Sequence, residues 1–245
     1  MQETDFLFDK TYECPVCYKK FKSKTVRSGR ARQIRTDMDL RPVFEGIEPL
    51  KYEPVVCTEC GYSAMGKNFA AGLLPIYAKY IRENITPSFH YNISPGATYT
   101  YDESVYEYKM CLANAIVKKG KTSEIAYICL KLGWLYRSKA ESLDPDEADY
   151  AEQLEACKTK EHQNIKKAYD AFIQARQTEG FPMCGMDEMT VEYLIAVLAM
   201  DVEDYEVASR LLGNVLTSHS ATPRMKDKAL DVKEELMKRM KTNKE

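Results

Sequence analysis

The 245-residue sequence lacks the segments that would place it in a membrane or send it out of the cell. No apolar run approaches the roughly 18 residues that a transmembrane helix needs. The N-terminus, residues 1–5, is acidic and carries no apolar stretch, so it does not resemble a signal peptide. We therefore expect a cytoplasmic protein that does not enter a membrane.

Residues and motifs that carry catalysis are also scarce. The chain has three histidines, His90, His162 and His219, and each stands apart from the other two. It contains no nucleophile elbow, no phosphate-binding loop and no zinc-protease helix motif. An enzyme is therefore only the third alternative, after the two kinds of binding protein described below.

What the sequence does contain is a doubled cysteine motif. Four of its eight cysteines form two hooks, Cys14-x-x-Cys17 and Cys57-x-x-Cys60. Each hook places two sulfurs on one side of a tight turn, and two facing hooks complete a tetrahedral site. In a chain without secretion signals this spacing indicates a metal rather than disulfides. We predict that the four thiolates hold a structural zinc ion, with iron as the alternative.

The patterning of the chain predicts a mostly α protein in three parts. Residues 1–64 carry the hooks and short extended runs, which predict a small β-rich, zinc-ribbon-like domain. Within it, Ser28-Gly29 is the expected turn of a hairpin between Lys22–Arg27 and Arg30–Thr36. Residues 65–101 form a bridging segment, and residues 102–245 show the apolar spacing of helices.

Capping and breaking residues delimit the helices expected in residues 102–245. Asp102 is expected to cap a helix over 103–119, and a second helix spans 122–142. Asp144-Pro145 predicts the start of a third helix, which reaches Thr178. Three further helices are expected to begin at Asp187, Asp204 and Thr222-Pro223.

Two segments of this helical part resemble the tetratricopeptide repeat. Cys129-x2-Leu132-Gly133-x2-Tyr136 is similar to the first-helix signature of that repeat, with Cys in the place of the usual Trp. Residues 203–208 look like the start of its second helix. Ala199 stands where a first helix usually has Tyr, and residues 137–165 form a long insertion, so the array is irregular. The resemblance implies paired helices around a groove that binds a peptide or protein partner.

Four side chains are candidates for lining such a groove. They are hydrogen-bond donors that lie off the apolar stripes of the expected first helices: Lys109, Asn114, Lys131 and Arg137. Donors of this kind suit backbone carbonyls and carboxylates, so we predict an acidic or C-terminal peptide as their ligand. Ordinary solvated residues would show the same pattern.

A basic segment supports the alternative function, a nucleic-acid-associated adaptor. Between Lys10 and Arg35 there are nine Lys or Arg residues against one acid, Glu13. Positive charge concentrated in this way attracts the phosphate backbone. The same arginines could instead be solvated or paired with Asp37 and Asp39. The candidate phosphate contacts are Arg27, Arg30, Arg32 and Arg35, with Arg30 and Arg32 on one face of a strand.

Further residues of the N-terminal part combine with the hooks into one pattern. They are Cys14-Pro15-Val16-Cys17, Phe21, Val26-Arg27-Ser28, Asp37-Met38-Asp39-Leu40, Pro42, Pro49-Leu50-x-Tyr52 and Val56-Cys57-x-x-Cys60-Gly61-Tyr62-Ser63-Ala64. The pattern as a whole resembles an uncharacterised bacterial family, the domain of unknown function 2225, closely over residues 12–64 and more loosely beyond. The resemblance implies a cytoplasmic bacterial protein with a metal-hook domain and a helical remainder, and the family carries no assigned activity.

Overall fold

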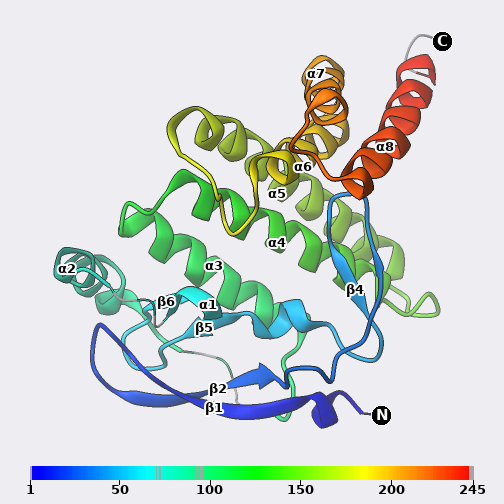
Figure 1. Cartoon of the computed structure of the whole chain (residues 1–245). Coiled ribbons are helices and arrows are strands. Elements are labelled where there is room, and N and C mark those ends of the chain that lie inside the picture. The colour runs from blue at the N-terminus through cyan, green and yellow to red at the C-terminus, as the bar shows by residue number, and fades with distance from the viewer. Residues whose placement is uncertain (1, 70, 72, 92, 94–95, 243–245) are drawn as a thin grey trace.

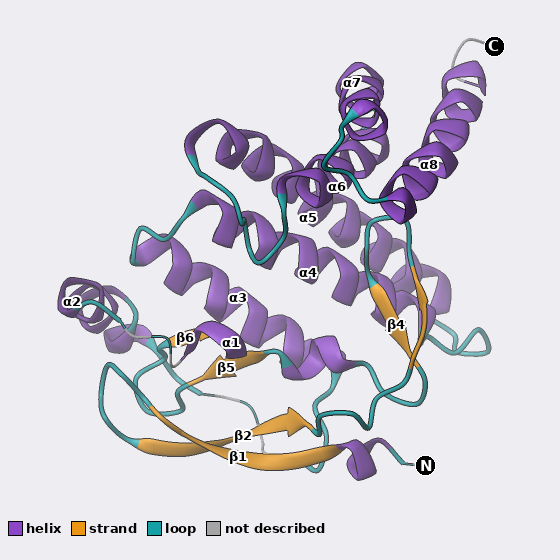
Figure 2. Ribbon diagram, viewed as in Figure 1, coloured by secondary structure: helices purple, strands orange, loops and turns teal. Residues whose placement is uncertain are grey.

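The computed structural model describes residues 2–69, 71, 73–91, 93 and 96–242 (Figure 1). Short strand pairs occupy the N-terminal part of the chain and helices make up most of the remainder (Figure 2). The predicted fold class, mostly α with a small β-rich N-terminal part, is confirmed. None of the helices in the described ranges is both long and apolar enough to span a bilayer.

The described strands form three separate antiparallel pairs rather than one sheet. The first hook lies between β1 and β2, and the second hook lies between β5 and β6, so each hook closes its own hairpin. This is the arrangement that a zinc-ribbon plan predicts. The pairs are β1 (Leu7–Glu13) with β2 (Lys20–Val26), β3 (Gln33–Thr36) with β4 (Pro42–Phe44), and β5 (Pro54–Val56) with β6 (Ser63–Met65).

The predicted hairpin around Ser28-Gly29 is wrong. β2 pairs with the preceding strand β1, which places Tyr12 opposite Phe21. The cause is the first hook, whose backbone hydrogen bond from Cys14 N to Lys19 O at 3.0 Å brings these two strands together. The segment after Gly29 instead leads to β3, which pairs with β4.

Most of the predicted helices are confirmed, several with their caps. Asp187 accepts the backbone N–H of Thr190 at 2.8 Å, and Asp204 accepts that of Val207 at 3.2 Å. The helices are α1 (Gly66–Phe69), α2 (Pro75–Asn84), α3 (Tyr101–Val117), α4 (Thr122–Glu141), α5 (Tyr150–Thr178), α6 (Glu188–Asp201), α7 (Tyr205–Thr217) and α8 (Pro223–Thr242), with 3-10 turns η1 (Glu3–Phe6), η2 (Pro49–Tyr52) and η3 (Thr86–Ser88).

Two predicted helix starts are wrong. α3 begins at Tyr101 because Thr100, not Asp102, is its N-cap: the Thr100 hydroxyl accepts the N–H of Glu103 at 3.2 Å, and the Glu103 carboxylate accepts the N–H of Thr100 at 2.7 Å. α5 begins at Tyr150 rather than near Asp144. The Asp144 carboxylate accepts the N–H of Asp146 at 3.0 Å, which stabilises a local turn in place of a helix start.

The largest hydrophobic core lies among α3 to α8 and includes Leu50 and Met65 from the N-terminal part. α4 and α5 approach each other closely at Gly133. A Cβ atom there would lie 2.9 Å from Ile165 Cδ1, so a side chain at this position would require Ile165 to shift. The glycine of the repeat-like signature therefore has a packing role in this chain.

α3 joins the two parts of the chain. The Tyr108 hydroxyl donates to the carbonyl of Leu50 at 3.1 Å. The Asn114 amide donates to the carbonyl of Gly61 at 3.0 Å and to the Ser63 hydroxyl at 2.7 Å. Because these side chains are buried, the helical part and the second hook share a packed boundary. The division of the chain at residues 64 and 101 stays a prediction.

A carboxylic acid is buried in this boundary region. Glu107 on α3 is 1% exposed; its Oε1 accepts from the Tyr91 hydroxyl at 3.2 Å, while its Oε2 has no partner among the described residues. Burial raises the pKa of Glu107 to about 8, against the opposing hydrogen bond from Tyr91 and with a smaller contribution from the like charge of Glu103. The folded chain therefore holds a proton on Glu107 at neutral pH.

Replacing Glu107 with Gln should stabilise the protein increasingly as pH rises. An unfolded Glu releases its proton near pH 4.5, whereas folded Glu107 keeps its proton until about pH 8. The wild type thus loses free energy of unfolding across this window, by about 1.4 kcal/mol per pH unit, and Gln does not. Urea unfolding of both proteins at several pH values between 5.5 and 8 measures the difference. The exposed Glu234→Gln is the control, and a gain for Glu107→Gln that is independent of pH would contradict this expectation.

Candidate metal centre

The four hook cysteines converge on one point. Their sulfurs all lie within 4.8 Å of one another, with Cys14 Sγ 3.5 Å from Cys60 Sγ and Cys17 Sγ 3.6 Å from Cys57 Sγ. A tetrahedral ion with metal–sulfur bonds of about 2.3 Å separates its ligand sulfurs by about 3.8 Å. The cluster therefore fits one tetrahedral metal ion.

Local backbone geometry explains why each hook forms. In the first hook the N–H of Tyr18 donates to the carbonyl of Cys14 at 2.9 Å; in the second the N–H of Gly61 donates to that of Cys57 at 3.0 Å. Tyr18 and Gly61 occupy equivalent positions and both have positive φ, 61° and 74°. The chain must reverse here to bring the second cysteine of each hook beside the first.

The cysteine sulfurs favour a shared negative charge. Hydrogen bonds from the Cys57 and Cys60 thiols lower the pKa of Cys14 to about 4, whereas hydrogen bonds with Cys14 and Cys57, together with burial, raise the pKa of Cys60. One thiol of the cluster therefore loses its proton readily. Further thiolates at these distances would repel one another, so a cation is needed to hold them together. This donor set can hold a metal ion such as zinc or iron.

Apolar side chains and one helix shield the cluster from water. Cys14, Cys57 and Cys60 are buried and Cys17 is partly exposed. Outside them, the Arg82 guanidinium of α2 donates to the carbonyl of Val16 at 3.2 Å, and the Thr86 hydroxyl donates to that of Cys60 at 2.9 Å. The packed apolar side chains include Tyr12, Phe21, Val55, Tyr62, Phe69 and Ile81.

Comparison with protein families gives a match over nearly the whole chain. Residues 7–236 match the family described as an uncharacterized protein conserved in bacteria (DUF2225). The chain belongs to this family. No curated protein and no solved structure matches it. The DUF2225 match covers both the hooks and the helical part, so the resemblance seen in residues 12–64 extends through α7 and most of α8.

Gly61 is expected to tolerate no side chain in this DUF2225 member. Its φ of 74° disfavours other residues, and a Cβ there would lie 2.6 Å from Cγ and Cδ2 of Phe89. Gly61→Ala should lower the free energy of unfolding by about 3 kcal/mol, the sum of backbone strain and the displacement of Phe89. Denaturant unfolding of the metal-loaded protein measures this loss.

Gly29→Ala is the matched control, because Gly29 has the same φ of 74° with no atom within 4 Å of its added Cβ. It should cost only the backbone term, about 1 kcal/mol. Equal losses for the two variants would show that Phe89 moves aside freely.

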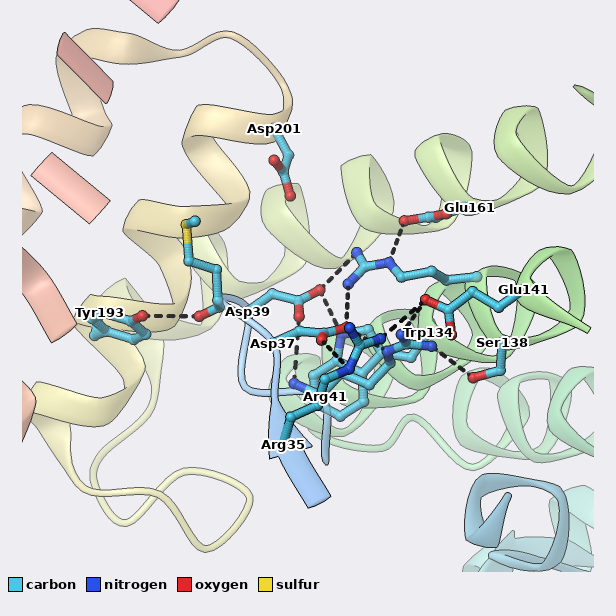
Figure 3. A network of polar contacts seen from close by, with 12 residues as sticks. Arg35, Asp37, Asp39, Arg41, Trp134, Ser138, Glu141, Glu161, Tyr193 and Asp201 are labelled. Carbon is cyan, nitrogen blue, oxygen red and sulfur yellow. Dashed lines mark hydrogen bonds and ion pairs between the residues drawn. The ribbon is translucent and has the colours of Figure 1, made fainter. Parts of the chain in front are cut away.

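A second polar site joins the β3–β4 hairpin to the helices (Figure 3). Its turn, which we call the hairpin tip, comprises residues 37–40. Asp39 is 2% exposed and accepts from Trp134 Nε1 at 2.8 Å and from Arg137 Nη2 at 2.8 Å. The Tyr193 hydroxyl donates to the carbonyl of Met38 at 2.9 Å.

Arg41 anchors the base of the hairpin tip. Its guanidinium, 1% exposed, donates to Asp37 Oδ2 at 2.7 Å, to Ser138 Oγ at 2.8 Å and to Glu141 Oε1 at 2.6 Å. These bonds offset the cost of burying the charge, and the pKa of Arg41 is raised because the hydrogen bonds and charges of Glu141 and Asp37 outweigh its desolvation.

The structure corrects the expectation that all four candidate donors face a groove. Asn114 is buried against Gly61 and Ser63, and buried Lys131 pairs with Glu53 at 2.8 Å. Both donors are satisfied within the chain because α3 and α4 lie against the N-terminal part. Arg137 pairs with Asp37, Asp39 and Glu161, and Lys109 alone of the four is exposed.

The basic segment does not form the strand face that the sequence predicts. Arg30 lies in a turn and Arg32 lies in the irregular segment just before β3, because the strand begins only at Gln33. Arg35 in β3 pairs with Asp37 at 3.6 Å and with Glu141 at 3.5 Å, so the pairing with Asp37 that we left open is present. Arg27 and Arg30 are exposed, and Arg32 pairs with Glu45 at 3.7 Å at the surface.

Sequence reasoning missed the role of Trp134, Ser138 and Tyr193 in holding the hairpin tip. These residues lie 95, 97 and 155 positions from their partners Asp39, Arg41 and Met38, so no local pattern connects them. The available signal was the Asp37-Met38-Asp39-Leu40 motif, whose two acids are spaced to meet donors on one side of a turn.

Proposed function

We propose that this protein is a cytoplasmic, non-enzymatic zinc-binding interaction module whose helices bind a peptide or protein partner. The observation that carries the metal assignment is the convergence of four cysteine sulfurs within 4.8 Å. Four thiolates fill the coordination shell of zinc and leave no position for a reactive water. The ion in this proposal is therefore structural.

The helical part supports the interaction role. Consecutive helices α4, α5, α6 and α7 pack in sequence, in keeping with the tetratricopeptide-like array that the signature around Gly133 predicts. α4 and α6 also carry hydrogen-bond donors that bind a peptide segment. Trp134, Arg137 and Tyr193 donate to the chain's own hairpin tip. An acidic segment is the partner chemistry that these donors suit.

Two measurements test this function. Elemental analysis of the purified protein should give one zinc per chain, and a protein without stoichiometric zinc or iron would contradict the metal assignment. Capture from a bacterial lysate, with the tagged full-length chain as bait, should give a partner whose binding is competed by acidic peptides. A chain that captures nothing above the level of an unrelated zinc protein would contradict the interaction role.

One observation favours nucleic acid as a second candidate ligand. Tyr18 is 72% exposed at the end of the first hook, beside exposed Lys19 and Lys20, and it adopts a φ of 61° where the second hook uses glycine. An exposed aromatic ring flanked by cations suits stacking against single-stranded bases. Fluorescence anisotropy with single-stranded RNA and DNA at 50 and 200 mM salt tests it. Binding should weaken steeply with salt and be lost in Tyr18→Ala; no binding at 50 mM would exclude this candidate.

A further inference from the structure

The hairpin tip contacts the helices as a separate peptide would. Two side chains and one carbonyl of the tip meet donors from two helices. Trp134 and Arg137 of α4 hold the Asp39 carboxylate, and Tyr193 of α6 holds the backbone carbonyl of Met38 (Figure 3). Recognition thus depends on two acids and a main-chain atom between them, with Met38 itself 44% exposed. The middle side chain contributes little to the contact.

The receiving surface is held in place from within the helical part. Glu161 of α5 accepts from Arg137 Nε at 2.7 Å, which leaves Nη1 and Nη2 directed at Asp37 and Asp39, at 3.4 and 2.8 Å. Trp134 and Tyr193 also belong to the hydrophobic core among the helices. Contacts that do not involve the tip therefore help to position all three donors, and a preorganised site binds its ligand with a smaller ordering cost.

The arms of the hairpin allow the tip to leave. Among the described strands, β3 and β4 pair only with each other (Figure 1). All four residues of β3 are exposed, and the three residues of β4 are partly buried. Apart from the partial burial of Leu40 against the core, the tip is held by ion pairs and hydrogen bonds. Leaving these buried charges unpaired is costly, but an acidic segment that takes the place of the tip restores the same ion pairs, so exchange of one acidic segment for another avoids that cost.

We propose that Trp134, Arg137 and Tyr193 form a docking site for an Asp-x-Asp segment of a partner protein, and that the hairpin tip is its intramolecular competitor. This inference rests on the proposed interaction function and names its partner chemistry and its regulation. A partner binds when its acidic segment replaces Asp37–Asp39 on the helices. The occupied site lowers the apparent affinity for any segment that must displace the tip.

A partner protein is the favoured source of this segment rather than a second copy of the chain. Each copy carries one tip and one site, so an exchange between two copies gains no contact that the single chain lacks. Association of two copies would also cost the translational and rotational entropy of two separate molecules. A different protein that presents Asp-x-Asp can add contacts on either side of the motif.

The test uses a fluorescent peptide with the sequence of residues 35–42, Arg-Thr-Asp-Met-Asp-Leu-Arg-Pro, and the full-length metal-loaded chain. Asp39→Asn weakens the binding of the tip to the helices but leaves Asp37 and Arg41 paired. The tip should therefore leave the docking site more often and expose its donors. Anisotropy should show at least about tenfold tighter peptide binding to this variant than to the wild type. Adding Arg137→Gln to Asp39→Asn should abolish binding, and a peptide with both Asp residues replaced by Asn should not bind.

Hydrogen exchange of the wild type supplies an independent readout that needs no variant to fold. Excess peptide should accelerate amide exchange in residues 33–44 and leave that of α7 unchanged. If neither tighter binding nor faster exchange is seen, the proposal is overturned, and the hairpin is a permanent structural contact between the two parts of the chain. A dimer of Asp39→Asn in light scattering would overturn the assignment to a different protein. If Arg137→Gln still captures the wild-type partners, this site fails while the interaction function stands.

Discussion

Replacing Cys57 with Ser is expected to release the metal and unfold the hook region, the largest effect among the single substitutions considered. A serine hydroxyl does not ionise at neutral pH, so the site would keep three thiolates and an open position. In small zinc peptides the ion supplies on the order of 10 kcal/mol of folding free energy. Elemental analysis should show the loss of zinc, and the remaining hook thiols should become open to alkylation.

This loss should extend beyond residues 12–62. The second hook is bonded to α3 through Asn114, which donates to Gly61 and Ser63. Circular dichroism should therefore show weakened helices as well as lost strands. Cys184→Ser is the control: Cys184 lies outside the cluster, where its thiol donates to the carbonyl of Ser123 at 3.2 Å, and this variant should keep one metal ion. A Cys57→Ser protein with full metal content would contradict the four-sulfur site.

The second large effect is expected on deleting residues 1–101. Helical patterning predicts that residues 102–245 fold alone, and the contacts across the boundary lead us to the opposite expectation. Deletion removes Leu50 and Met65 from the core and takes Glu53 away from buried Lys131. It also removes Asp39 from Arg137. A buried charge without its partner typically costs 3–5 kcal/mol, comparable with the stability of a whole domain.

Thermal unfolding of residues 102–245, followed by circular dichroism, measures this effect against the full-length, metal-loaded chain. We expect a helical but non-cooperative transition, because the uncovered face of α3 has lost its packing partners. A cooperative transition near the temperature of the full-length protein would show instead that the helical part has a core of its own and that the boundary at residue 102 divides two domains.

Features encoded within a few residues could be predicted from the sequence. The two hooks follow from cysteine spacing, and the starts of α6, α7 and α8 follow from Asp187, Asp204 and Thr222-Pro223. Gly133 belongs to the predicted repeat-like signature, and the structure shows the close approach of Ile165 at this position, 2.9 Å from an added Cβ. In each case a short motif and its backbone requirement coincide.

Features that depend on distant contacts could not be predicted. The sequence predicts that Asn114 and Lys131 line a peptide-binding groove because they lie off the apolar stripe, yet the N-terminal part covers them. Asp39 was a possible partner only for the arginines of the basic segment, although in the structure it is buried against Trp134. A polar residue carries no local sign that a partner elsewhere in the chain will satisfy it, so its burial appears only in the folded structure.

The hairpin tip occupies the position that the sequence assigns to an external acidic peptide. Arg137 was expected to bind an acidic peptide, and in the folded chain it pairs with the acids of residues 37–39. The ligand chemistry expected of this arginine is thus present, supplied by the chain itself. This is the reason for treating the tip as a competitor of an external acidic segment.

The central claim is that one zinc ion is bound by Cys14, Cys17, Cys57 and Cys60. X-ray absorption spectroscopy of the purified protein at the zinc edge tests it most directly, because it reports the identity, number and distance of the ligands together. We expect stoichiometric zinc with four sulfur ligands at about 2.3 Å. A first shell that contains nitrogen or oxygen, or a signal from iron in place of zinc, would contradict it.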